Sequence, residues 1–140
     1  MHVLMKACGA FLTLGYLALV GCESTNTRQE TPWTLVSVSD VSTVAGKWEG
    51  LLRRMPPTKQ DDWVTLVIQP DGRYEFVSVR TIGAMSGQGE FTTSDGKLTT
   101  SSERGSIEAA LYETGGHRML RTKARGADGT QYFSDLKQAK

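Results

Sequence analysis

The stretch Trp63-VTLVIQPDGRYEFVSV-Arg80 contains two β-strand patterns joined by one tight turn. Pro70-Asp71-Gly72 carries the turn, because Gly supplies the positive φ angle that tight turns require. Apolar and aromatic side chains alternate with other residues on both sides of it: Val64, Leu66 and Ile68, then Tyr74 and Phe76. This spacing places each set on one face of an extended strand. The stretch therefore predicts an antiparallel hairpin.

The same signals continue along the chain. Further turns are predicted at Asp95-Gly96, Gly115-Gly116 and Asp128-Gly129. Eight strands are predicted in all: Lys47–Arg53, Trp63–Gln69, Arg73–Arg80, Ser86–Thr93, Lys97–Ser101, Ser106–Glu113, Arg118–Ala124 and Thr130–Lys137. No segment of helical period is long enough to cover a sheet. We therefore expect an all-β, antiparallel up-and-down meander that hides its edges by closing into an eight-stranded barrel, with a β-sandwich as the alternative.

One short helical turn is expected before the first strand, over Asp40–Ala45, with Ser39 or Asp40 as its N-cap. The strand that follows opens with Gly46-Lys47-Trp48-Glu49-Gly50, which resembles the Gly-x-Trp element of lipocalins and related bacterial lipocalin-like domains. The resemblance covers roughly Val41 to Lys137. It implies structural roles for Gly46 and Trp48, with Trp48 packed across the closed end of the barrel under Arg118 or Arg121. The second lipocalin signature, Thr-Asp-Tyr, is absent and the predicted strands are short, which argues against a capacious cavity.

The N-terminal segment has the order of a secretory signal, with Lys6 before the apolar run Ala7–Val20. That run is shorter than the roughly twenty residues of a spanning helix. Leu19-Val20-Gly21-Cys22 resembles the bacterial lipobox, which implies a mature chain that starts at an acylated Cys22. We expect a signal peptide over residues 1–21, a tether over 22–32 and one domain over 33–140. An ordinary secretory peptide or a short membrane anchor is the alternative, and Met5 is a possible start.

Glu23 follows the cysteine where, in the usual Gram-negative rule, Asp would retain the protein at the inner membrane. The sequence thus predicts a lipid-anchored protein of the outer membrane that faces the periplasm, with surface exposure as the alternative. The formal net charge is +1 and there is no long basic run, so nucleic acid is not an expected partner. Cys8 lies in the signal and Cys22 carries the lipid, which leaves no cysteine for a disulfide or a thiol nucleophile.

Catalytic and metal-binding patterns are weak. His117 follows a predicted turn without an acid to orient it, and the Asp and Glu residues show no paired or metal-ligand spacing. The chain is therefore predicted to be no enzyme and to need no cofactor or metal; a hydrolase using His117 or a Glu is the least favoured reading.

A binding site is predicted instead at the barrel rim opposite the tether, because alternate connections of a meander fall at the same end. The longer connections are Arg54–Asp62, Thr81–Met85, Ser102–Gly105 and Arg125–Gly129. They and their flanks supply the predicted site residues Arg53, Arg54, Met55, Arg80, Ile82, Met85, Arg104 and Arg125. Arginine suits anionic groups and methionine adapts to apolar shapes. We expect a binding lipoprotein for a small amphipathic or anionic ligand; the alternative is a filled barrel that docks on another envelope protein.

Overall fold

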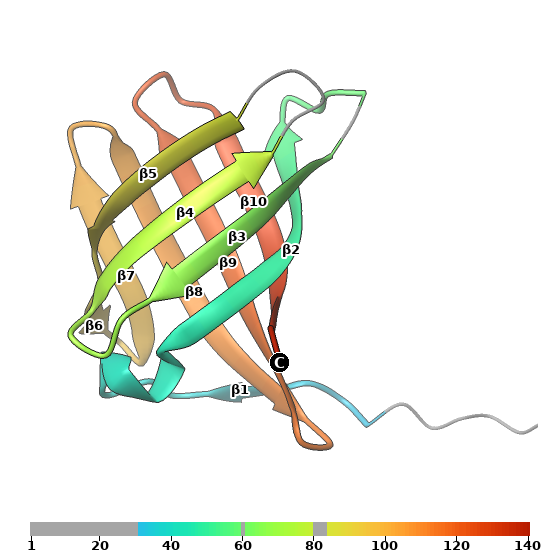
Figure 1. Cartoon of the computed structure of the whole chain (residues 1–140), viewed down its shortest axis with the longest axis vertical. Helices are drawn as coiled ribbons and strands as arrows, with labels where there is room; N and C mark the ends of the chain where they lie inside the picture. Colours follow the sequence, from blue (N-terminus) through green and yellow to red (C-terminus); the bar gives the residue numbers. More distant parts are fainter. Residues whose placement is uncertain (1–30, 60, 80–83) are drawn as a thin grey trace, which may run out of the picture.

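The computed structural model describes residues 31–59, 61–79 and 84–140, and Figure 1 shows their arrangement. Within these residues, ten strands form one antiparallel sheet that curls into a nearly closed barrel. The elements are β1 (Thr34–Val36), the 3-10 turn η1 (Val41–Val44), β2 (Gly46–Met55), β3 (Asp62–Ile68), β4 (Arg73–Val79), β5 (Ala84–Glu90), β6 (Thr92–Ser94), β7 (Lys97–Ser102), β8 (Gly105–Thr114), β9 (His117–Gly126) and β10 (Gln131–Gln138). None of the helices in this part of the chain is long and apolar enough to cross a membrane.

The all-β, up-and-down barrel predicted from the sequence is confirmed. The strands follow the order β5-β4-β3-β2-β10-β9-β8-β7-β6, and β1 pairs with the C-terminal end of β8. Because all strands belong to one continuous sheet, the sandwich alternative is not the architecture of this chain. The sequence predicted eight strands, and the structure has two further short ones, β1 and β6. β1 was not anticipated, and the predicted strand Ser86–Thr93 breaks at Phe91, which is buried, so that β6 begins as a separate strand.

The predicted helical turn is also present. Asp40 is its N-cap, and its carboxylate accepts a hydrogen bond of 2.9 Å from the backbone N–H of Ser42. The turn brings Val44 into the core, where the Val44 carbonyl accepts a bond of 2.9 Å from Trp48 Nε1. This segment and β1 cross one end of the barrel (Figure 1), which makes it the closed end.

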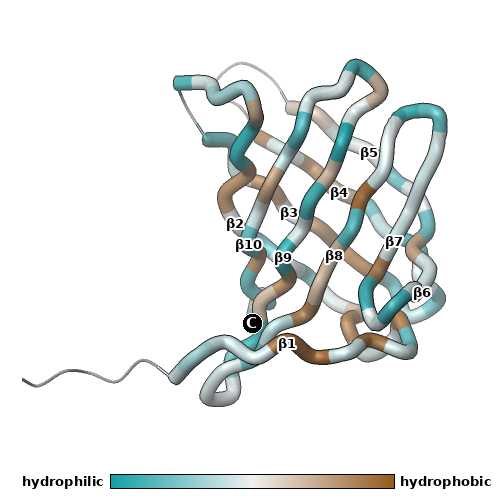
Figure 2. Tube along the Cα trace, turned by 180° about the vertical axis from the view of Figure 1, so that it is seen from behind, coloured by the Kyte–Doolittle hydropathy of each residue, from teal (hydrophilic) through white to brown (hydrophobic). Residues whose placement is uncertain are grey.

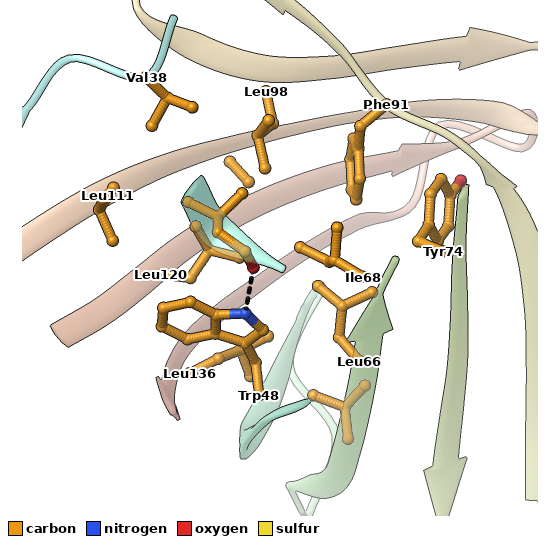
Figure 3. Close-up of a cluster of buried hydrophobic side chains, with 13 residues drawn as sticks. Val38, Trp48, Leu66, Ile68, Tyr74, Phe91, Leu98, Leu111, Leu120 and Leu136 are labelled. Atoms are coloured by element: carbon orange, nitrogen blue, oxygen red, sulfur yellow. Dashed lines mark hydrogen bonds between the residues drawn. The ribbon is translucent and has the colours of Figure 1, made fainter. Parts of the chain in front are cut away.

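The core fills the closed half of the barrel. Trp48 is fully buried there, among apolar side chains that converge from several strands (Figure 3). They are Val38, Val44, Val64, Leu66, Ile68, Tyr74, Phe91, Leu98, Ala109, Leu111, Leu120 and Leu136. The alternating positions that defined the first hairpin from the sequence thus point inward.

Side chains close the barrel between β5 and β7, because no described strand pairs with the outer edge of β5. Tyr74 of β4 packs against Phe91, with 4.3 Å between ring centroids, and shares a hydrogen bond with Thr100 of β7. Burial raises the pKa of Tyr74, and the bond to Thr100 acts in the opposite direction. The Tyr74 ring fits against β5 because residue 89 is a glycine; a Cβ there would come within 2.6 Å of the Tyr74 hydroxyl oxygen.

Candidate functional site

The predicted rim residues that the structure describes lie on both faces of the sheet. Arg80, Ile82 and Cys22 lie outside the described residues. Arg53 and Arg54 are neighbours on β2 and therefore face opposite sides of the sheet. Arg53 is exposed on the outer wall, 3.9 Å from Asp61, whereas Arg54 is half-buried on the inner side.

The remaining rim residues are divided in the same way. Met85 is half-buried on β5 and lines the interior, whereas Met55 is exposed at the end of β2. Arg125 is exposed on β9, and Arg104 is exposed in the turn between β7 and β8. Of the described rim arginines, Arg53, Arg104 and Arg125 are therefore exposed and Arg54 is half-buried.

A small apolar pocket lies in the interior of the barrel. Its volume is about 90 Å³, and its walls are Leu52, Val64, Leu66, Phe76, Met85, Phe91, Ile107, Thr122, Ala124, Tyr132, Ser134 and Leu136. Sites for drug-sized ligands typically occupy roughly 300–1,000 Å³. Ser78 is cross-strand neighbour to both Val64 and Met85, and its buried hydroxyl has no hydrogen-bond partner. The pocket is too small to enclose a whole amphiphile.

A much larger depression lies on the outer wall, over β2, β10, β9 and β8, which stand side by side in Figure 2. We call it the outer trough. Its volume is about 680 Å³, and outward-facing residues that line it are Glu49, Leu51, Arg53, Trp63, Lys97, Glu108, Ala110, Tyr112, Arg121, Lys123, Phe133, Asp135 and Lys137. Leu51 and Trp63 are cross-strand neighbours, and each is 47% exposed. The outer trough therefore offers an apolar patch to a partner.

The carboxylates of the outer trough are already paired. Glu108 accepts a hydrogen bond of 2.9 Å from Lys97, which raises the pKa of Lys97, and Asp135 accepts two from Arg121, at 2.8 and 3.2 Å. Arg121 also lies 5.0 Å from the centre of the Tyr112 ring.

Glu49 is bound by Lys47 at 2.6 Å. In the described part of the chain, no carboxylate lies within ion-pair distance of Lys123 or Lys137. These two lysines leave the outer trough with surplus positive charge.

No catalytic constellation emerges around His117. It is exposed at the start of β9, beside the turn at Gly115-Gly116. Within residues 31–59, 61–79 and 84–140, no group of three or more His, Cys, Asp or Glu side chains could hold a metal ion.

Sequence reasoning missed the outer trough. Its apolar members occupy the strand positions that the inward alternation left to solvent, notably Leu51, Trp63 and Phe133. A large apolar residue at an outward strand position is a sequence signal for a binding surface on the outer wall. Only the pairing of β2 with β3 and β10 brings the three together.

No family model matches this chain, and no curated protein or solved structure matches it either. Fold and site together define an all-β, up-and-down barrel with a packed closed end and a recessed outer wall.

Proposed function

We propose that this chain is a lipid-anchored, non-enzymatic binding protein of the cell envelope, held at the outer membrane through Cys22 and facing the periplasm. Its partner docks on the outer trough. The observation that carries this proposal is the contrast between the two recesses, about 90 Å³ inside the barrel and about 680 Å³ outside. The proposal follows the filled-barrel alternative and moves the binding surface from the rim to the wall.

The chemistry of the outer trough indicates an acidic partner surface with an apolar anchor, as another envelope protein would present. Lys123 and Lys137 supply positive charge outside any ion pair with a described carboxylate, and their cross-strand neighbours Glu108 and Glu49 are each bound by another lysine. Leu51 and Trp63 supply an exposed apolar patch beside them. Opposite charge speeds association and selects partners, whereas a central aromatic anchor supplies most of the affinity. Binding should therefore weaken as salt rises.

Site-specific photo-crosslinking in the native cell tests the proposal. A photo-crosslinking amino acid replaces Leu51 in the outer trough or, as the matched control, Val67, which is 40% exposed on β3 outside it. We expect a protein adduct from position 51 only, and we expect Lys123→Glu with Lys137→Glu to abolish it. Equal adducts from both positions, or none from position 51, would contradict the proposal.

A small amphipathic ligand is the second candidate, because the interior pocket is apolar and the unpartnered Ser78 hydroxyl lies beside two of its wall residues. Such a ligand would insert only the end of an acyl chain. Ala124→Leu should fill the pocket from β9. A fluorescent fatty acid that binds the wild type and not Ala124→Leu would support this candidate, and equal binding to both would reject it.

A further inference from the structure

Strand β1 and the residue before it present two large apolar side chains to solvent. Trp33, which precedes it, is 40% exposed and Leu35 is 54% exposed. Leu35 is the cross-strand neighbour of Tyr112 on the outer wall, whereas Val36 is the neighbour of Leu111 and packs against the core. Trp33 lies two residues before Leu35, which is the spacing of side chains on one face of an extended strand.

This edge lies where the tether enters the domain. The Thr31 carbonyl accepts a hydrogen bond of 2.7 Å from Thr114 Oγ1, and all three residues of β1 pair with β8. Residues 23–31 span at most about 30 Å even when fully extended. A lipid on Cys22 therefore keeps Trp33, eleven residues further along the chain, within about 40 Å of the bilayer.

We propose that Trp33 and Leu35 form a second, non-covalent membrane contact, which seats the β1 edge of the closed end in the interfacial layer of the bilayer that holds Cys22. The proposal rests on the lipid anchor of the proposed function. Trp is favoured at membrane interfaces because its ring is apolar and its N–H needs a polar partner. The short tether gives the pair a high effective concentration at the surface, so a weak contact suffices.

The surrounding charges indicate how the barrel is seated. The closed end also carries the exposed carboxylates Asp40, Asp71 and Asp95, in η1's cap and in two turns. Figure 1 places η1 and the β3–β4 turn across this end from the β8–β9 turn. Asp71 is ion-paired with Arg73, as Glu113 beside β1 is with Arg118. An anionic bilayer would therefore repel mainly Asp40 and Asp95, so the β1 side approaches the lipid. The contact is apolar and should form on uncharged lipid and persist in high salt.

Lipid-quenching fluorescence of the acylated protein tests this contact. The protein is reconstituted in phosphatidylcholine vesicles whose acyl chains carry bromine, which quenches only tryptophans that reach the bilayer. Trp48 is buried in the barrel core and Trp63 is on the outer wall of β3, so Trp33→Phe and Trp63→Phe separate the sources of emission. We expect quenching in the wild type and in Trp63→Phe, and its loss in Trp33→Phe.

Each other outcome overturns the inference in a recognisable way. Protein that floats with the vesicles while Trp33 is not quenched keeps the anchor and removes the contact. A Trp33 emission shift that grows with protein density, without quenching, assigns the edge to a second copy of the chain. Protein that does not float removes the anchor and the contact together. Flotation of the Trp33→Ala/Leu35→Ala variant should equal that of the wild type, because the lipid alone holds it.

Discussion

The Arg118 guanidinium lies over the Trp48 ring, 5.6 Å from its centre, which places a cation on the face of the buried indole. Arg118 also donates hydrogen bonds to the Thr43 carbonyl at 2.7 Å and to Gln138 at 3.3 Å, and its Nε lies 3.2 Å from Glu113. Through these contacts Arg118 links β9 to η1 and to the end of β10 above the Trp48 ring. Of the two arginines that the lipocalin resemblance offered, Arg118 takes this position.

Truncation of Trp48 should be the most costly single change in the closed end. We expect Trp48→Ala to lower the free energy of unfolding by about 3–5 kcal/mol, since it empties a fully buried site. Thermal unfolding followed by circular dichroism measures the loss. Trp63→Ala is the matched control, because its ring is half exposed and should cost far less; equal melting of Trp48→Ala and wild type would show that the ring does not plug the barrel.

The two arginines should differ in their contribution to stability. Arg118→Ala removes two hydrogen bonds and one ion pair over the core, and we expect a loss of about 1–2 kcal/mol. Arg121→Ala breaks an ion pair whose partners are each about half exposed, which typically costs less than about 1 kcal/mol. Urea titration of both variants decides the comparison, and a larger loss in Arg121→Ala would reverse the assignment.

Gly50 should not tolerate a side chain. A Cβ at this position would lie 2.5 Å from the Asp135 carbonyl oxygen, where β2 meets β10. Overpacking of this kind typically costs about 1–3 kcal/mol, so Gly50→Ala should unfold at lower denaturant. At Gly126 the close contact is the flexible Asp128 side chain, at 2.9 Å, and Gly126→Ala should be milder. Equal midpoints for the two variants would refute the close approach.

Acid should weaken the fold through three turn carboxylates. Backbone hydrogen bonds from Ser42, Arg73 and Thr130 lower the pKa values of Asp40, Asp71 and Asp128, respectively, below the usual 3.8. A group with a lowered folded-state pKa contributes stability above its unfolded pKa, and that stability is lost as the pH falls through the folded value. Unfolding midpoints should therefore be level near neutral pH and fall below about pH 4. The Asp40→Asn/Asp71→Asn/Asp128→Asn variant should show a shallower fall; an unchanged slope would assign the acid sensitivity to other groups.

The fold could be predicted because local signals and global topology agree. The hairpin between β3 and β4 was defined by period-two alternation and by Pro70-Asp71-Gly72, which needs no distant contact to form. β1 could not be predicted, since three residues without alternation become a strand only through pairing with β8. The break at Phe91 is likewise tertiary, because the ring leaves the strand pattern to pack against Tyr74.

The site was harder to predict than the fold. Reasoning from loop composition grouped Arg53 with Arg54, but alternation along β2 sends them to opposite faces of the sheet. The outer trough combines residues far apart in the sequence, such as Trp63 and Phe133, through strand pairing and sheet curvature. Its surplus charge depends on which carboxylates are already paired, and that depends on distances between side chains.

Intact-mass spectrometry of the protein from its native membrane tests the central claim, the lipid anchor, most directly. We expect a chain that begins at Cys22, lacks residues 1–21 and carries a diacylglyceryl group with its acyl chains on that cysteine. An unmodified Cys22, or a mature chain that retains Ala7–Val20, would contradict it.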